Sequence, residues 1–321
     1  MGRKRKRKKN RIAEPTMTSP IKEIIADIGN SDNPLLNSRL TELSNLSSEE
    51  LELFESSWTV IKPERRRQIV YRLVELAEDN LELNFDSIFK HCLEDRDDEV
   101  RSKAIEGLWE SEEASLINTL VNLLKQDSSE EVQAAAATAL GKFAILAEHN
   151  KLRSSHISRI QEALLSMIND KAKPVEVRCR ALEAAAPLSL SQVGIAIMEA
   201  YQSHNSRLRV SAIHAMGKNC DSSWLPILLK ELASTDAEVR YEATRACGEL
   251  EEKQTVPCLT KLVNDIDADV QMAAIQTLGK IGDTQAKECL EQCLNNPNEA
   301  ISQAAKQALL DLEAKETPLS F

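Results

Sequence analysis

One alanine column recurs along the chain at a nearly fixed interval. The column consists of Ala104, Ala136, Ala181, Ala212, Ala243, Ala274 and Ala305, and each of its last four steps is 31 residues long. A period of about 30 residues predicts a stack of small, similar units, each of which buries its apolar side against the next one. The repeat therefore limits the possible architectures before any motif is considered.

Each repeat is predicted to hold two helices joined by turns. An apolar anchor stands four residues before each alanine, and the anchors are Val100, Val132, Val177, Leu208, Val239, Val270 and Ile301. The anchor and the residues four, seven and eight places later form one stripe of a helix. Three places before most anchors stands a residue suited to cap a helix, such as Asp236 or Asp267. A second amphipathic segment precedes each cap, as at 256–263.

The segment 236–250, which reads DAEVRYEATRACGEL, resembles the second helix of HEAT repeats, in particular the short phycobilisome-lyase-like kind. The resemblance covers residues 48 to 312, although Arg65 stands where the first unit should have its anchor. It implies an all-α fold, a right-handed α-solenoid of about eight HEAT-type helical hairpins. End units of solenoids commonly depart from the consensus because one of their faces meets water.

The composition agrees with a helical array, since only 3% of the residues are aromatic and 28% are charged. We expect a basic disordered tail at 1–16, a polar linker at 17–46 with at most one short helix at 21–28, the solenoid at 47–315 and a C-terminal tail at 316–321. The step between Val132 and Val177 carries 14 extra residues. These predict an elongated hairpin around 142–158, which serves either a partner or only as a spacer.

Charge divides the chain into a basic start and an acidic body. The first eleven residues hold eight of the 40 basic side chains, which leaves 32 against 51 acidic ones, a net charge of −19. The basic residues are candidates for contact with nucleic acid, a ribosomal surface or anionic lipid: Arg3, Lys4, Arg5, Lys6, Arg7, Lys8, Lys9 and Arg11. The alternatives are a disordered leader that only keeps the protein in solution, a tail that folds loosely against the acidic body, and a translation start at Met17.

The second helices offer a candidate partner-binding surface on the inner curve of the solenoid. Residues two places after each anchor point away from the buried stripe, and three of them are Val210, Tyr241 and Met272. Polar residues four places further on would form a rim, as at a protein-binding patch. The candidate residues are Cys179, Val210, His214, Tyr241, Arg245, Met272 and Gln276. Alternatively, the curvature brings these rows together and partly buries them without a partner.

Two further features have alternative interpretations. One place after the anchor stand the arginines Arg101, Arg178, Arg209 and Arg240, which could bind phosphate or pair with acidic and capping groups of an adjacent unit, such as Asp97, Asp236 or Asp267. Trp109 stands where later units have glycine, and it is either a packing plug or an exposed anchor.

No catalytic or metal site is predicted. His149 and His156 lack a third ligand at metal spacing, and Cys258, Cys289 and Cys293 align with apolar core positions. Deoxyhypusine hydroxylase resembles this architecture, but it binds iron through His-Glu dipeptides, which are missing from this sequence. We therefore predict no metal and no cofactor.

The function favoured by these patterns is a non-catalytic scaffold or adaptor that binds a protein partner along its concave face. Two alternatives stay open: an enzyme or enzyme subunit similar to phycobilisome lyases or deoxyhypusine hydroxylase, and an RNA- or ribosome-associated protein recruited by the basic tail. The sequence has no apolar run long enough for a membrane span and seven unpatterned cysteines. These features predict a cytoplasmic protein, and we expect it to be monomeric.

Overall fold

The computed structural model describes residues 20–316, and within this range the chain forms α-helices, two short 3-10 helices and no strands. It divides into two compact units, one up to Leu108 and one from Trp109 onwards. The eight predicted helical hairpins are present, and the all-α solenoid fold is confirmed.

Unit 1 contains six helices. They are α1 (Pro20–Gly29), α2 (Asn37–Thr41), α3 (Ser48–Trp58), α4 (Pro63–Asp79), α5 (Asp86–Cys92) and α6 (Asp98–Gly107). The hairpins are α3 with α4 and α5 with α6.

Part of the expected linker at 17–46 is folded onto unit 1. Helix α1 packs on α3 and α4 and buries its four isoleucines, Ile21, Ile24, Ile25 and Ile28. Arg65 replaces the apolar anchor of α4 because its guanidinium reaches this segment. Its Nε donates to the carbonyl of Ile28 at 2.5 Å and its Nη2 to that of Asn33 at 3.1 Å. The segment therefore covers the first hairpin.

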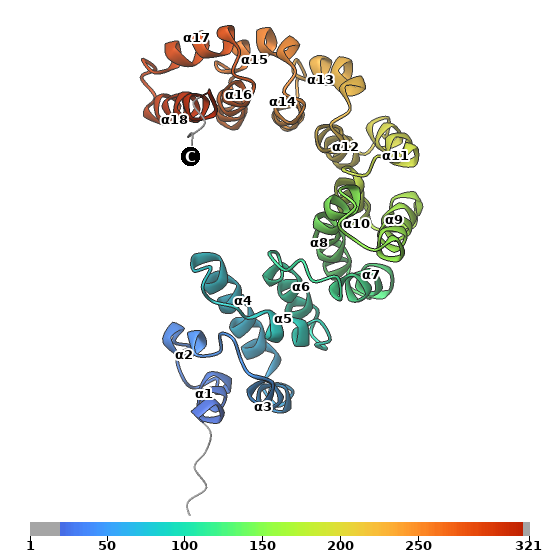
Figure 1. The fold of residues 1–321 in the computed structure, drawn as a ribbon, viewed down its shortest axis with the longest axis vertical. Coiled ribbons are helices and arrows are strands. Elements are labelled where there is room, and N and C mark those ends of the chain that lie inside the picture. The colour runs from blue at the N-terminus through green and yellow to red at the C-terminus, as the bar shows by residue number, and fades with distance from the viewer. Residues whose placement is uncertain (1–19, 317–321) are drawn as a thin grey trace, which may run out of the picture. The chain divides into compact units, whose positions relative to one another are not determined.

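Unit 2 contains six hairpins. Their helices are α7 (Leu116–Gln126), α8 (Glu130–Glu148), α9 (Ser154–Asn169), α10 (Val175–Ala185), α11 (Ser191–Tyr201), α12 (Ser206–Asn219), α13 (Leu225–Glu231), α14 (Ala237–Leu250), α15 (Val256–Leu262), α16 (Ala268–Ile281), α17 (Thr284–Cys293) and α18 (Glu299–Glu316). Short 3-10 turns at Ser222–Trp224 and Lys253–Thr255 precede α13 and α15. The second helices pack in sequence and line the inner side of unit 2, with the first helices outside (Figure 1).

The repeating columns form the core. All seven alanines of the column are 0% exposed, and the anchors beside them are buried as well. The extension of α8 lies in this core too, since Phe143 is 1% exposed and Ala144 is 0% exposed. Helix α8 ends at Glu148 and α9 begins at Ser154, and the extension of α8 packs within unit 2.

Glycine substitutions are expected to have opposite effects at two positions. A Cβ added at Gly217 of α12 would lie 2.6 Å from the Cα of Ala246 in α14, so the two helices would have to separate. We expect Gly217→Ala to destabilise unit 2 by about 1 kcal/mol, the overpacking cost less the gain in helix propensity. At Gly194 of α11 the nearest heavy atom, Trp224 Cζ2, is 4.0 Å away. Gly194→Ala is expected to stabilise by about 0.5–1 kcal/mol.

Urea denaturation followed by circular dichroism measures both changes. Equal shifts of the same sign in the two variants would contradict the close approach of α12 and α14.

Candidate protein-binding surface

The inner helices of unit 2 carry the predicted partner-binding residues on successive turns of the array. Val210 and His214 lie on α12, Tyr241 and Arg245 on α14, and Met272 and Gln276 on α16; we call these six residues the inner row. Arg245 and Gln276 are exposed and the other four are half-buried. Since α12, α14 and α16 pack side by side, the inner row is one continuous strip.

Cys179 does not belong to this strip, although it was predicted to. It is only 4% exposed, and Ser211 from α12 donates to its carbonyl at 3.2 Å. Burial raises the pKa of its thiol. Helix α12 thus lies close enough to α10 to cover Cys179. This agrees with the alternative interpretation, in which the curvature partly buries these rows without a partner.

Glu242 links two residues of the inner row, and the sequence analysis did not include it. One of its carboxylate oxygens lies 3.2 Å from His214 Nδ1 and the other 3.8 Å from Arg245 Nη1. The Arg245 guanidinium also lies 5.6 Å from the ring centroid of Tyr241, within cation–π range. These contacts hold the polar and aromatic side chains of α12 and α14 in one arrangement.

A groove of about 780 Å³ lies between α16 and α18 and continues the inner row. Met272 and Gln276 line it from α16, and Gln303 and Gln307 line it from α18. The two α18 glutamines stand two and six places after the anchor Ile301, in the same columns as the inner row. Selecting the residues two and six places after every anchor would therefore have identified these glutamines as further candidates.

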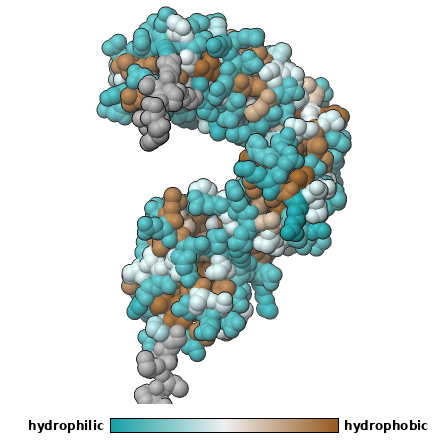
Figure 2. Space-filling view, viewed as in Figure 1, coloured by the Kyte–Doolittle hydropathy of each residue, from teal (hydrophilic) through white to brown (hydrophobic). Residues whose placement is uncertain are grey.

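The surface around these elements is mixed. Figure 2 shows hydrophobic residues interspersed among hydrophilic ones on the face that it presents. Trp109 is 53% exposed, which excludes the interpretation as a packing plug. The exposed large apolar residues are thus distributed along the array, whereas the apolar residues of the inner row are half-buried.

The arginines after the anchors have structural roles in two hairpins. Arg240 donates from Nε and Nη2 to Asp265 at 2.8 and 2.7 Å, and from Nη1 to the carbonyl of Ser234. Arg66 reaches Asp95 at 3.1 Å in the same way. The carboxylate partner lies two residues before the next cap, a position that the sequence analysis did not name.

Four cysteines, Cys92, Cys179, Cys247 and Cys293, are buried as small apolar residues would be, whereas Cys220 is exposed. Burial raises the pKa of the Cys247 thiol to about 12 and that of the Cys289 thiol to about 11, so both stay protonated near neutral pH. All seven cysteines are free. Across residues 20–316 no group of three or more His, Cys, Asp or Glu side chains is arranged to hold a metal ion.

Two further predictions concern the basic tail and membrane-spanning segments. The basic residues from Arg3 to Arg11 lie outside the described residues. None of the helices in the described range is both long enough and apolar enough to span a bilayer.

Comparison with known proteins identifies the repeat. The family model for HEAT repeats matches residues 86–153 and 225–310. The chain contains HEAT repeats. The HEAT assignment made from the 236–250 segment is thereby confirmed, and no curated protein matches the chain in sequence.

Solved structures show the same HEAT fold. Yeast importin-β (Kap95p) is 15% identical, with a TM-score of 0.54, over 93% of this chain and 46% of that protein. The Kap95:Nup1 complex gives 14% identity and a TM-score of 0.53 over 93% and 46%. The complex of CpcE and CpcF of phycocyanin lyase from Nostoc sp. PCC7120 gives 18% identity and a TM-score of 0.52 over 73% of this chain and 89% of that one. This chain therefore spans less than half of importin-β.

Proposed function

We propose that this HEAT-repeat chain is a non-catalytic scaffold or adaptor that binds a protein partner along the inner row and the adjoining α16–α18 groove. The partner would be an extended or helical segment with apolar side chains, because the strip combines Tyr241 and Met272 with polar neighbours on both sides. We include a cytoplasmic location in this proposal, since all seven cysteines are unpaired.

The proposal rests mainly on one observation: the residues that line the α16–α18 groove include those that stand two and six places after the anchors. Met272, Gln276, Gln303 and Gln307 line the groove, and all four occupy the two columns that point away from the buried stripe. Glutamines offer donors and acceptors to a partner backbone without adding charge. Methionine adapts to apolar side chains of differing shape.

The structural neighbours support the proposal at the level of the fold. Kap95 occurs in a complex with Nup1, and CpcE occurs in a complex with CpcF. Solenoids of this kind thus form complexes with other proteins through extended surfaces. The partner of this chain is a matter for experiment, because fold analogy does not assign one.

Truncating two residues of the inner row is expected to weaken partner binding. Proteins captured from the native host by the wild-type chain are identified, purified and titrated against Tyr241→Ala plus Met272→Ala. We expect the affinity to fall by about tenfold or more, since large aromatic side chains at the centre of an interface often dominate binding.

A matched control truncates two exposed apolar residues elsewhere. Ile195 on α11 is 60% exposed and Ile266, before α16, is 99% exposed. Ile195→Ala plus Ile266→Ala should bind as the wild type does. If the partner binds the inner-row variant as tightly as this control, the proposed surface is wrong.

A further inference from the structure

A recurrent ion pair joins successive hairpins, and its absence after the α10 hairpin leaves an arginine without its carboxylate. In the complete form, Arg240 pairs with Asp265, 25 residues later. Asp265 Oδ1 also accepts from the backbone N–H of Asp267 at 2.9 Å, which shapes the turn before α16. One aspartate thus serves both the turn and the arginine.

In the α10 hairpin, the same position holds a serine. Arg178 stands one place after its anchor, as Arg240 does, and Ser203 follows Arg178 at the same interval at which Asp265 follows Arg240. Ser203 Oγ accepts from the backbone N–H of Asn205 at 3.1 Å, so the turn before α12 is kept. The carboxylate for the arginine is missing.

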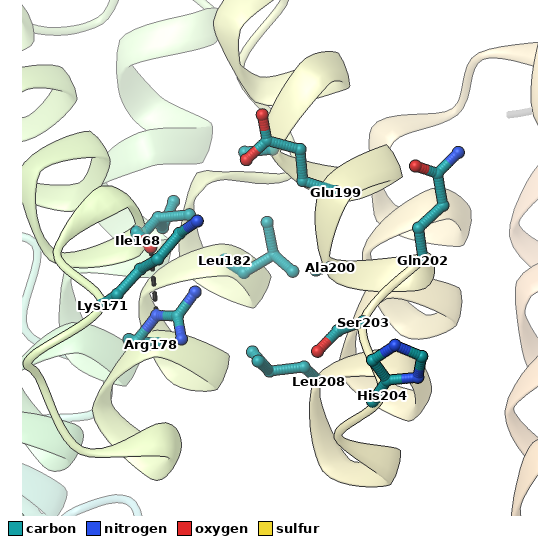
Figure 3. Close-up of a pocket in the computed structure, with 11 residues that line it drawn as sticks. Ile168, Lys171, Arg178, Leu182, Glu199, Ala200, Gln202, Ser203, His204 and Leu208 are labelled. Atoms are coloured by element: carbon teal, nitrogen blue, oxygen red, sulfur yellow. Dashed lines mark hydrogen bonds between the residues drawn. The ribbon is translucent and has the colours of Figure 1, made fainter.

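The guanidinium of Arg178 consequently keeps free donors. Its Nε donates to the carbonyl of Ile168 at 3.2 Å, and no other described residue bonds to it. Figure 3 shows Arg178 and Lys171 on one side of a groove, with Ser203 and His204 on the other. Arg178 and Lys171 therefore line the same space as the polar residues Ser203 and His204, together with Gln202 and Glu199.

The groove has an apolar part and a size suited to a small ligand. It measures about 460 Å³, within the range of small-molecule sites. Leu182, Ala196, Ala200 and Leu208 line it and are all buried. A ligand held by Arg178 would thus rest its apolar part against α10, α11 and the start of α12.

We propose that this groove, between α10, α11 and α12, binds an organic carboxylate with a small apolar body, which takes the place of the missing aspartate. Guanidinium groups bind carboxylates through two parallel hydrogen bonds, as Arg240 does with Asp265 through Nε and Nη2. In Arg178, whose Nε donates to Ile168, the two Nη groups are left for such a pair. Lys171 adds a second positive charge. Glu199, exposed at the rim and in no ion pair with a described residue, opposes the ligand charge. The site is separate from the inner row and does not depend on the proposed function.

The probe for the experiment is N-acetylleucine, and its neutral amide is the reference. NMR titration of the 15N-labelled chain should give saturable shifts at Ser203 and His204 with the acid but not with the amide. In Arg178→Gln the affinity should fall by about tenfold or more, because charged hydrogen bonds are lost. In Glu199→Gln it should rise by about two- to fivefold, because a like charge is removed.

Two further variants keep the result specific to this position. Arg209 occupies the same register one hairpin later and is likewise followed by a serine, Ser234, but neither residue lines the groove. Arg209→Gln should leave binding unchanged. Ser203→Asp restores the internal carboxylate and should abolish binding while preserving the fold. If N-acetylleucine binds Ser203→Asp or Arg178→Gln as it binds the wild type, or if the amide binds equally well, the proposal fails.

A peptide separates the two sources of such a carboxylate. A tetrapeptide that ends in leucine with a free carboxylate is titrated beside its C-terminal amide. Binding of the free peptide at the affinity of N-acetylleucine assigns the groove to protein chain ends. Binding of N-acetylleucine alone assigns it to free organic acids. Binding of neither compound overturns the site.

Discussion

Arg240→Gln is expected to lower the free energy of unfolding of unit 2 by about 3 kcal/mol, because it leaves a buried carboxylate without its counter-charge. The side chains of Arg240 and Asp265 are only 8% and 7% exposed and share two hydrogen bonds. Glutamine is the least disruptive replacement, since Gln271, in the same register, donates to the carbonyl of Asp265. The thermal midpoint should fall by about 6–12 °C, measured by circular dichroism.

The matched control removes the second charge as well. In Arg240→Gln plus Asp265→Asn no unpaired charge is buried, so most of the lost stability should return. If the free energy of unfolding of Arg240→Gln lies within about 0.5 kcal/mol of that of the wild type, as for an ordinary surface substitution, the pair does not have this role.

The effect of Arg240→Gln should also depend on pH. The hydrogen bond from Arg240 holds the pKa of Asp265 below its usual range. A carboxyl group with a lowered pKa in the folded state contributes stability above its unfolded pKa of about 4, and this is lost as the pH falls through the folded pKa. The difference between wild type and variant should therefore be full at pH 7 and shrink below pH 4.

The fold could be predicted because the residues that recur in the repeat are the ones that are buried between the helices. Each alanine of the column is fully buried, and the nearby Gly217 and Gly279 approach Ala246 and Ala308 of the next second helix, so larger side chains in this region would have no space. Caps such as Asp267, which accepts from the N–H groups of Asp269 and Val270, fix the start of several second helices. The same local pattern returns in most hairpins of the array, so the sequence contains several independent copies of one prediction.

The short helix expected at 21–28 is present, but its packing on unit 1 was not predicted, because its contacts are not local. Prolines and polar residues suggested a linker around this helix, while Ile21, Ile24, Ile25 and Ile28 follow the spacing of a buried helix face. That spacing was the available signal for the burial of the helix. Arg65 appeared to break the pattern because its partners, the carbonyls of Ile28 and Asn33, lie 37 and 32 residues away.

The candidate surface was predictable in its columns but not in its exposure. The repeat predicts that Val210, Tyr241 and Met272 share a face, whereas the spacing between helices decides how far each one is covered. Cys179 is in the same column and is buried, because α12 packs over α10 there. The groove at Arg178 likewise depends on the residue two places before the cap of the next second helix, which is Ser203 here and Asp265 after Arg240. The importance of that position becomes visible only when the ion pair of Arg240 is compared with the unpaired Arg178.

Ala243→Leu tests the central packing feature, and we expect it to destabilise unit 2 by about 3 kcal/mol, near the upper end of the usual cost of overpacking a core. Ala243 is 0% exposed on α14, which packs against α12 and α16 on either side. Equivalent alanines, Ala212 and Ala274, are 0% exposed on those two helices. Because Ala243 is fully buried on a helix that packs against neighbours on both sides, the added carbons have no space unless neighbouring elements move.

The same substitution at an exposed alanine isolates this packing cost. Ala268, in the first turn of α16, is exposed, and Ala268→Leu should change the free energy of unfolding by less than about 0.5 kcal/mol. Urea denaturation of both variants gives the comparison. Because separation of α14 from its neighbours would also alter the inner row, Ala243→Leu should weaken partner binding, whereas Ala268→Leu should not. Equal stability of the two variants would mean that small residues in this column are not required for the stacking of the hairpins.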